Sequence, residues 1–346
     1  MLQQTRPRES TTPSDPALHL LTLASGFFMS QAIFVAARLG LADLLAGAPR
    51  SAAELAAATG THPHSLARVL RMLANAGLFA VDAEGRFANT PVSDRLRADH
   101  SHSVRNYVLV LAEEWMWQSA PGLQRSIEAG EPAFNRIYGK PIYDHMKEHP
   151  AAAHVFDEGM TAYSKISADA LAAAYPLPQG ARIVDVGGGH GHQLEAFLRA
   201  SPGARGVLFD LPHVIEAARP RVQATDVADR CELVGGDFFE SIPEQADYYM
   251  LRSVVHNWSD DHAVALLKKC RTAMAAGGKV LLVEVVVSPG STPLFSELLD
   301  VQMQLFTLGR ERTEDEFRRL YQQAGLRMTR VVQTASFMSV IEGVAA

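Results

Sequence analysis

The sequence predicts a mixed architecture in which an all-α domain with a winged-helix motif precedes an α/β domain built around mostly parallel strands. Two observations predict it: apolar residues recur at helical spacing up to about residue 175, and beyond that point short apolar strands alternate with helical segments. We expect four segments, namely a disordered leader (residues 1–16), a winged-helix domain (17–100), a helical linker (101–175) and the α/β domain (176–346).

Composition excludes several classes of function. The 346 residues contain 32 Lys and Arg against 38 Asp and Glu, so the formal net charge of −6 is too acidic for a general binder of nucleic-acid phosphates. Hydrophobic residues make up 47% of the chain, which is typical of a folded globular protein. Only Cys231 and Cys270 are cysteines, so a disulfide framework and a thiolate metal cluster are excluded, and a reducing, cytoplasmic environment is expected.

A stretch free of Asp, Glu, Lys and Arg runs from Pro16 to just before Arg38. The residues before it, which include Arg6 and Arg8, do not form a signal peptide. We therefore expect a helix buried in an interface between two subunits, and no membrane partner. The stretch has the length of a membrane-spanning helix, but polar residues dilute it: Thr22, Ser25, Gly26, Ser30 and Gln31.

A winged helix-turn-helix is predicted before the linker. Ser51 and Glu54 have the spacing of a capping box at a helix start, and Gly60 ends that helix. A second helix follows, and then two short strands, residues 78–81 and 86–88, flank a turn. The second helix has one apolar stripe, which consists of Leu66, Val69, Leu70 and Leu73.

This motif leaves two functions open. In a repressor, the second helix would enter the DNA major groove with Arg68 and Arg71 as its basic side chains. In the other case the motif serves only for packing and dimerisation. We favour the second function, without a nucleic-acid partner, because that helix has only two basic residues and several acids lie nearby: Glu54, Asp82, Glu84 and Asp94.

The α/β domain begins with a strand, a glycine turn and a helix. Residues 182–186 (RIVDV) form an apolar strand, and residues 187–191 (GGGHG) form the turn. Glycines let the backbone approach a ligand closely, and the start of the next helix offers free N–H groups. The dinucleotide fingerprint G-x-G-x-x-G is absent, because its third glycine position is His192.

Three further strands end in residues suited to a nucleoside. Asp210 follows Gly187 by 23 positions, close to the spacing of about 20 at which a carboxylate meets ribose hydroxyls. Asp237 and Phe238 suit the amino group and the ring of an adenine, and Arg252 follows the fourth strand. Because ligands bind at the carboxyl ends of parallel strands, we expect one site there. The three strands are residues 206–210, 232–234 and 247–251.

From about Gln31 to the C-terminus, the chain resembles the class I S-adenosylmethionine-dependent O-methyltransferases of the plant caffeate and bacterial aromatic-metabolite type. The matching strings are, in order, VDVGGGHGH, FDLPHVI, VGGDFFESIP, LRSVVHNWSDD, GGKVLLVE and GRERTEDEF. The resemblance implies a homodimer in which a winged-helix dimerisation domain precedes a Rossmann-like catalytic domain with a mostly parallel, seven-stranded sheet. It also implies S-adenosyl-L-methionine as cofactor, S-adenosyl-L-homocysteine as its product, and an aromatic hydroxyl of a small secondary metabolite as methyl acceptor.

The resemblance assigns the strand tips to this cofactor. The backbone around Gly187 would hold the methionine end, Asp210 the ribose, and Asp237 with Phe238 the adenine. The full set of implied cofactor residues is Asp185, Gly187, Gly188, Gly189, Asp210, Leu211, Gly236, Asp237, Phe238, Phe239, Arg252, Ser253 and Trp258.

His256, just after the fourth strand, is the expected general base. A phenol with a pKa of about 10 needs a base near neutral pH, and an imidazole with a pKa of about 6.5 suits that task. By resemblance, Glu284 at the end of the fifth strand (279–283) and Glu311 in the GRERT turn flank the imidazole. Family members often carry Asp directly after the histidine, whereas this chain has Asn257, which leaves the site one charge poorer.

Each of the two carboxylates also has a purely structural interpretation. Glu284 would then be a solvated acid at a strand end, and Glu311 a partner of Arg310 or Arg312. No metal is expected, because the remaining histidines show no carboxylate-rich cluster.

The acceptor is expected between the linker helices and the segment before GRERT. By resemblance, these segments present methionine and aromatic side chains to a flat ring, although core packing remains the alternative for each of them. The candidate acceptor residues are Trp115, Phe156, Met160, Tyr163, Asn257, Gln302, Met303 and Phe306.

Two alternatives to O-methylation remain. The same scaffold could carry N-methylation, or a cofactor-dependent hydroxylation or decarboxylation, and the mass of the product made with a labelled methyl donor would distinguish these. The other alternative is a winged-helix regulator that senses the cofactor or a metabolite. The set of His256, Glu284 and Glu311 argues against such a regulator.

Overall fold

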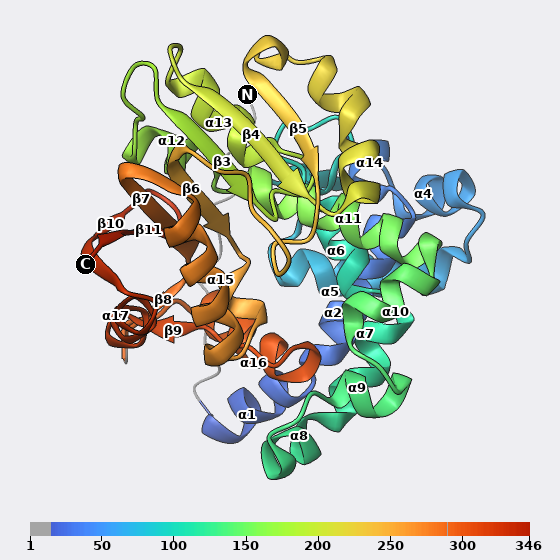
Figure 1. The fold of residues 1–346 in the computed structure, drawn as a ribbon. Helices are drawn as coiled ribbons and strands as arrows, with labels where there is room; N and C mark the ends of the chain where they lie inside the picture. Colours follow the sequence, from blue (N-terminus) through green and yellow to red (C-terminus); the bar gives the residue numbers. More distant parts are fainter. Residues whose placement is uncertain (1–14, 289) are drawn as a thin grey trace. The chain divides into compact units, whose positions relative to one another are not determined.

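The computed structural model describes residues 15–288 and 290–346, and the chain divides into two compact units, Met1–Ala112 and Glu113–Ala346 (Figure 1). The boundary falls inside the segment predicted as a helical linker. Of the predicted leader, residues 1–14 lie outside the described part of the chain.

The first unit contains the predicted winged helix-turn-helix. Ser51 and Glu54 form a reciprocal capping box, in which Ser51 Oγ accepts the Glu54 N–H at 3.2 Å and the Glu54 carboxylate accepts the Ser51 N–H at 2.7 Å. Gly60 ends the helix with a φ of 64°. The elements are α1 (Pro16–Ala24), α2 (Gly26–Arg38), α3 (Leu41–Leu44), α4 (Ala52–Thr59), α5 (Pro63–Asn75), β1 (Phe79–Val81), β2 (Phe87–Asn89), η1 (Ser93–Leu96) and α6 (Arg105–Leu111).

The second helix of the motif, α5, packs inward through its apolar stripe, while Arg68 and Arg71 are exposed. β1 and β2 pair antiparallel, with Phe79 opposite Asn89, and form the wing. The buried residues of α5 are Leu66, Leu70 and Leu73.

Helices α1 and α2 carry an exposed apolar surface. No residue of α1 is buried, and the rings of Phe27 and Phe28 in α2 lie 4.0 Å apart. Among the described residues, no single helix is long and apolar enough to cross a membrane, and α1 and α2 pass that test only as a pair bent by 47°. The exposed apolar residues of this surface are Leu18, Leu20, Leu21, Leu23, Phe27 and Phe28.

The second unit is built on a seven-stranded sheet in the order β10-β11-β7-β6-β3-β4-β5 (Figure 1). Strands β7, β6, β3, β4 and β5 run parallel, whereas β11 is antiparallel to both β7 and β10. The prediction of a mostly parallel, seven-stranded sheet is therefore confirmed. The strands are β3 (Arg182–Val186), β4 (Arg205–Asp210), β5 (Cys231–Gly235), β6 (Ala246–Arg252), β7 (Met274–Glu284), β10 (Leu326–Gln333) and β11 (Ser339–Ala345), and β8 (Val286–Val287) pairs with β9 (Arg312–Thr313) in a separate sheet.

Alternate residues of each strand enter two different cores. Val184 and Tyr249 lie in the core that α15 and α17 close, and Ile183 and Met250 lie in the core that α12, α13 and α14 close. The sheet is thus covered by helices on both faces, which explains its uninterrupted apolar strands. These helices are α12 (Ala168–Ala174), α13 (His192–Ala200), α14 (Pro212–Gln223), α15 (Asp260–Ala273) and α17 (Glu314–Gln323).

Further helices precede the sheet, two short ones lie between its strands, and one follows β8. The later helix, α16 (Leu294–Phe306), packs against α8 and α9. The others are α7 (Glu114–Ser119), η2 (Ala120–Gly122), α8 (Leu123–Ala129), α9 (Ala133–Tyr138), α10 (Ile142–Glu148), α11 (Pro150–Lys165), η3 (Ala228–Arg230) and η4 (Val255–Asn257).

Parallel pairing brings the carboxyl ends of the strands into one row. Val186 of β3 lies opposite Phe209, Asp210 of β4 lies opposite Gly235, and Arg252 of β6 lies opposite Val283 of β7. The row is the edge at which ligands bind in parallel sheets.

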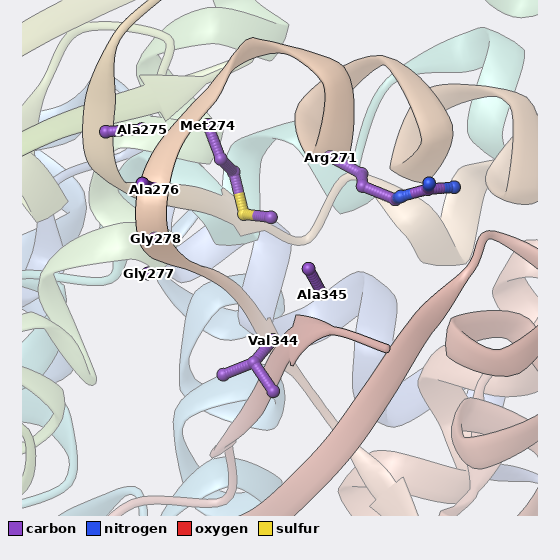
Figure 2. A pocket seen from close by; sticks show the side chains of 8 residues that line it. All are labelled: Arg271, Met274, Ala275, Ala276, Gly277, Gly278, Val344 and Ala345. Carbon is purple, nitrogen blue, oxygen red and sulfur yellow. The ribbon is translucent and has the colours of Figure 1, made fainter.

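A pocket of about 330 Å³ lies elsewhere, where β7 begins and β11 ends (Figure 2). Small or apolar residues and a single arginine line it: Arg271, Met274, Ala275, Ala276, Gly277, Gly278, Val344 and Ala345. None of these belongs to the predicted site.

Candidate active site

The glycine turn after β3 passes close to neighbouring side chains. Gly187 and Gly189 have φ angles of 70° and 56°, which glycine adopts far more readily than other residues. A Cβ atom on Gly188 would lie 2.7 Å from Asp185 Cγ and 2.5 Å from Leu208 Cδ1, so no larger residue fits there. The turn leads directly into α13, and it has the form that cradles a polar ligand group.

Asp210 at the end of β4 is bound to this turn. Its Oδ2 accepts the N–H of Gly189 at 2.8 Å, and its Oδ1 accepts the N–H of Leu211 at 2.7 Å. Burial raises the pKa of Asp210, and these two N–H donors oppose the rise. The strand tip expected at the ribose and the turn expected at the methionine end therefore lie together.

Asp185 and Arg252 carry buried polar atoms without partners. Neither carboxylate oxygen of the fully buried Asp185 has a hydrogen-bond partner within the described residues, and burial raises its pKa to about 7. The guanidinium of Arg252 donates to Ser164 Oγ at 2.6 Å and to Ser167 Oγ at 3.0 Å, while its Nε has no such partner. Unpaired buried polar groups are costly, so an acid and a guanidinium of this kind fit the ammonium and carboxylate of an amino-acid moiety.

Aromatic side chains gather after β5 and β6. Phe238, Phe239 and Trp258 form a cluster with ring centroids 4.7, 4.8 and 6.2 Å apart. A Cβ atom on Gly187 would lie 3.6 Å from the Phe238 ring, so the cluster adjoins the glycine turn. Asp237 Oδ1 accepts the N–H of Phe239 at 2.7 Å. Such a cluster of aromatic rings suits contact with the flat ring of a nucleobase.

The loop after β6 has a strained backbone at Ser253, whose φ is 51°. Asn257 Nδ2 donates to the Ser253 carbonyl at 3.0 Å and so closes this loop. An ionised Asp has no hydrogen to donate, so the amide performs a task here that the family's more usual carboxylate would not.

His256 lies in η4 and is buried together with both predicted carboxylates. Its Nδ1 is 2.8 Å from Glu311 Oε1 and 3.8 Å from Glu284 Oε2. The three residues come from the loop after β6, the end of β7 and the turn before β9. The structure therefore brings together residues that are far apart in sequence.

Glu284 also holds the backbone of the histidine loop. Its Oε1 accepts the N–H groups of Val254, Val255 and His256 at 3.2, 2.9 and 3.4 Å. Burial alone lowers the pKa of His256, but the charges of Glu311 and Glu284 outweigh it and raise the pKa to about 9. Burial also raises the pKa of Glu284 to about 7.

Three residues that were not among the predicted site residues complete the frame around this cluster. Asp300 Oδ1 accepts the N–H of Glu311 at 2.7 Å. A Cβ atom on Gly309 would lie 1.9 Å from the carbonyl oxygen of His256, so the backbones of the two loops pack directly on each other. Asp260 binds both Arg310 and Arg312, at 3.0 and 2.8 Å. Gly309 and Asp260 lie in two of the matching strings, GRERTEDEF and LRSVVHNWSDD, whereas Asp300 lies in none of them.

The aromatic residues expected at the acceptor lie partly together. The Trp115 ring is 6.2 Å from Phe134, 6.4 Å from Phe156 and 5.6 Å from Phe306. The Tyr163 ring lies 5.4 Å from the Arg252 guanidinium and 5.7 Å from the ring of Phe337. Of the remaining candidates, Met303 is buried on α16, and Gln302 and Met160 are partly buried on α16 and α11.

The ligand atoms of His256, Glu284 and Glu311 also lie within 4.8 Å of one another, a spacing compatible with a metal ion. However, His256 Nδ1 is already hydrogen-bonded to Glu311, and Glu284 Oε1 to three N–H groups. A metal would have to displace these bonds, so the donor set suits proton transfer better.

Fold and site together have the form expected of an α/β enzyme with room for a nucleoside-bearing ligand at the strand ends, next to a buried histidine–glutamate pair. Comparison with known proteins agrees. Residues 121–327 match the family described as O-methyltransferase domain, and residues 21–99 match the O-methyltransferase dimerisation domain.

Several of the similar proteins are bacterial enzymes matched over nearly their whole length. The phenazine O-methyltransferase PhzM of Lysobacter antibioticus is 39% identical over 93% of this chain and 94% of its own. The mitomycin biosynthesis 6-O-methyltransferase of Streptomyces lavendulae is 37% identical over 89% of this chain and 88% of its own. The crystal structure of CalO1, a methyltransferase in calicheamicin biosynthesis in its SAH-bound form, has a TM-score of 0.85 and 38% identity, covering 95% and 98%.

The chain belongs to the O-methyltransferase family with an N-terminal dimerisation domain. It is an S-adenosylmethionine-dependent O-methyltransferase. The family also contains a different chemistry, since the phenazine-1-carboxylate N-methyltransferase of Pseudomonas aeruginosa is 33% identical over 91% of this chain and 93% of its own.

Proposed function

We propose that this enzyme methylates an aromatic hydroxyl of a small secondary metabolite, with His256 as the general base. The observation that carries the proposal is the 2.8 Å hydrogen bond between His256 Nδ1 and Glu311 Oε1, buried at the carboxyl ends of the strands. Because Glu311 engages Nδ1, the other ring nitrogen, Nε2, is available to take the proton of the acceptor hydroxyl.

The cofactor supplies an electrophilic methyl group, and the residues of this chain hold it and orient the acceptor. Asp185 and Arg252 bind its amino-acid end, Asp210 its ribose, and Phe238 and Trp258 its base. Glu311 keeps the imidazole in one tautomer and stabilises the imidazolium that forms. Most of the rate comes from alignment of the reacting atoms, to which proton removal adds.

The acceptor class follows from the aromatic cluster and from the relatives. Trp115, Phe156 and Phe306 offer flat apolar surfaces to a planar ring. The names of two relatives specify a phenazine O-methyltransferase and a mitomycin biosynthesis 6-O-methyltransferase. We propose a multi-ring aromatic hydroxyl compound of that kind.

The enzyme is proposed to act as a homodimer. The match to a dimerisation domain over residues 21–99 supports this, as does the exposed apolar surface of α1 and α2, which a second copy would cover. A cytoplasmic location stays a prediction, which rests on the two unpaired cysteines, Cys231 and Cys270.

The test is a turnover assay with labelled S-adenosylmethionine and a panel of phenolic, amino and ring-nitrogen acceptors. His256→Ala is expected to lower the O-methylation rate by about 10²–10⁴-fold, the usual size of general-base catalysis, while cofactor affinity is retained. Near-full activity of this variant on every acceptor would rule out the assigned base. Label on nitrogen alone would establish N-methylation instead, and loss of activity with a chelator would indicate a metal at His256, Glu284 and Glu311.

A further inference from the structure

Arg312 is the largest fully buried side chain among the described residues, with 1% of its surface exposed. Burying a guanidinium is unfavourable unless every donor finds an acceptor. Its neighbour in sequence, Glu311, binds the imidazole of His256. The proposed role of His256 as the base does not explain why a guanidinium, whose burial costs desolvation free energy, lies next to it.

The guanidinium binds the histidine loop on both sides of His256. Its Nη1 donates to the Val255 carbonyl at 3.1 Å, and its Nη2 donates to the Trp258 carbonyl at 2.8 Å. Its Nε and Nη2 also donate to Asp260 Oδ1 at 3.0 and 2.8 Å, just where α15 begins. One residue therefore ties β9 to the loop that carries the base.

Arg312 also supplies positive charge to a cluster rich in carboxylates. The charged groups that act on the imidazole are Glu311, Glu284 and Arg312, and the Arg312 charge lowers the pKa of His256. Two acids act at one remove: Asp300 through the N–H of Glu311, and Asp260 through Arg312 itself. Without this buried cation, the two carboxylates would keep a still larger share of the imidazole protonated, and only the neutral form can accept a proton.

We propose that Arg312 is a positioning residue that holds His256 between its two carboxylates and, through its charge, keeps a larger share of the imidazole neutral. This inference rests on the proposed role of His256 as the base. It assigns two separable effects to one side chain. The branched guanidinium, called the fork below, holds the histidine loop through its N–H donors, and its positive charge favours the neutral imidazole.

The experiment separates these effects with three variants of the full-length protein. R312M removes fork and charge, R312K keeps the charge without the fork, and R310M is the matched control. Arg310 is half-exposed, lies two positions away and shares the Asp260 partner. For each, the titration midpoint of His256 is measured by NMR on histidine-labelled protein, with H256Q to identify the signal, and kcat and KM are measured against pH.

R312M is expected to raise the His256 midpoint by about one pH unit. R312K is expected to leave the midpoint near the wild-type value but to lower the high-pH plateau of kcat by about 10–100-fold, since a lysine cannot reproduce the fork. R310M is expected to change neither quantity. A purely structural role would lower thermal stability without moving the midpoint.

An unchanged midpoint in R312M, or a wild-type plateau in R312K, would overturn the inference. If R312M does not fold, D260N replaces it in the kinetic measurements. D260N leaves Arg312 in place but weakens the hydrogen bonds that hold its guanidinium. An unchanged kcat in D260N would count equally against the proposal. The NMR readout needs no turnover, so a failure of the base assignment, seen as an active H256A, is distinguishable from a failure of the role of Arg312.

Discussion

The imidazole of His256 is mostly protonated at neutral pH, because Glu311 and Glu284 raise its pKa from 6.5 to about 9. The charged form stabilises the folded state below pH 6.5, and this stabilisation is lost as the pH rises through about 9. Proton acceptance needs the neutral imidazole, so the reaction rate should rise over the same alkaline pH range in which this contribution to stability is lost. We therefore expect an alkaline optimum.

Glu311→Gln should shift the pH–rate profile toward acid. Removing the nearer carboxylate charge lowers the pKa of His256 by about one to two units, so a larger share of base is neutral at pH 7. The plateau rate should still fall, because the imidazolium loses a stabilising anion. The measurement is kcat/KM of both proteins from pH 6 to 10, and a profile with an unmoved midpoint would contradict the assigned pair.

Asp210→Ala should weaken cofactor binding by about 1.5–3 kcal/mol, because a charge-assisted contact to the ribose is lost. The same change frees the N–H of Gly189 and thus loosens the glycine turn. Calorimetric titration with the cofactor measures the loss. His256→Ala is the matched control and should bind normally; equal affinities of the two variants would refute the role of Asp210.

The positions of the candidate site residues could be predicted from the sequence more readily than the hydrogen-bond partners of those residues. Asp210 and Asp237 follow from strand ends and spacing, because a parallel sheet gathers those ends. The contact of His256 with Glu311 joins positions 55 residues apart; no local pattern specifies it, and only the family resemblance predicted it. Asp300 was missed for the same reason, since its acceptor role depends on how α16 meets the GRERT turn.

At the scale of elements, the GRERT turn and the histidine loop form one unit because Gly309 has no side chain. Gly309→Ala would push a methyl group into the backbone of His256, at 1.9 Å from its carbonyl oxygen. We expect a loss of about 1–3 kcal/mol in the free energy of unfolding and at least a 10²-fold loss in rate.

Thermal unfolding and turnover of the folded fraction check this expectation. Gly47→Ala is the control, because nothing lies within 4 Å of its added Cβ. Equal activity of the two variants would show that the loops are free to separate.

The sequence located five strands of the sheet and placed all but one of their ends within one residue. The fifth strand was expected from residue 279, whereas β7 begins at Met274 and passes through Gly277 and Gly278. These glycines have the composition of a turn, yet pairing with β6 draws Met274 into the sheet opposite Ala246. β10 and β11 were expected only as part of a seven-stranded total. β10 is largely exposed after Met328, and β11 carries the polar residues Ser339 and Glu342 among its buried positions, so neither shows a clear apolar period.

At the scale of the whole molecule, the apolar surface of α1 and α2 should bury itself in a dimer. The double variant Leu20→Glu with Leu23→Glu puts two charges on that surface and should yield monomers or aggregates. Light scattering after size-exclusion chromatography measures the mass. Val92→Glu is the control, an equally exposed apolar residue of the same unit outside α1 and α2. A wild-type mass for the double variant would place the interface elsewhere.

The strand order affects both the folding of the chain during synthesis and the choice of truncated fragments. β11 pairs with β7 on one side and β10 on the other, so the edge of β7 stays open during synthesis until residues 339–345 have emerged. An open, apolar edge in a partly made chain attracts other chains, and this makes the nascent protein a client for chaperones. A fragment cut at the limits of the matched methyltransferase region, residues 121–327, would carry that open edge permanently. Expression trials should therefore retain everything through Ala345.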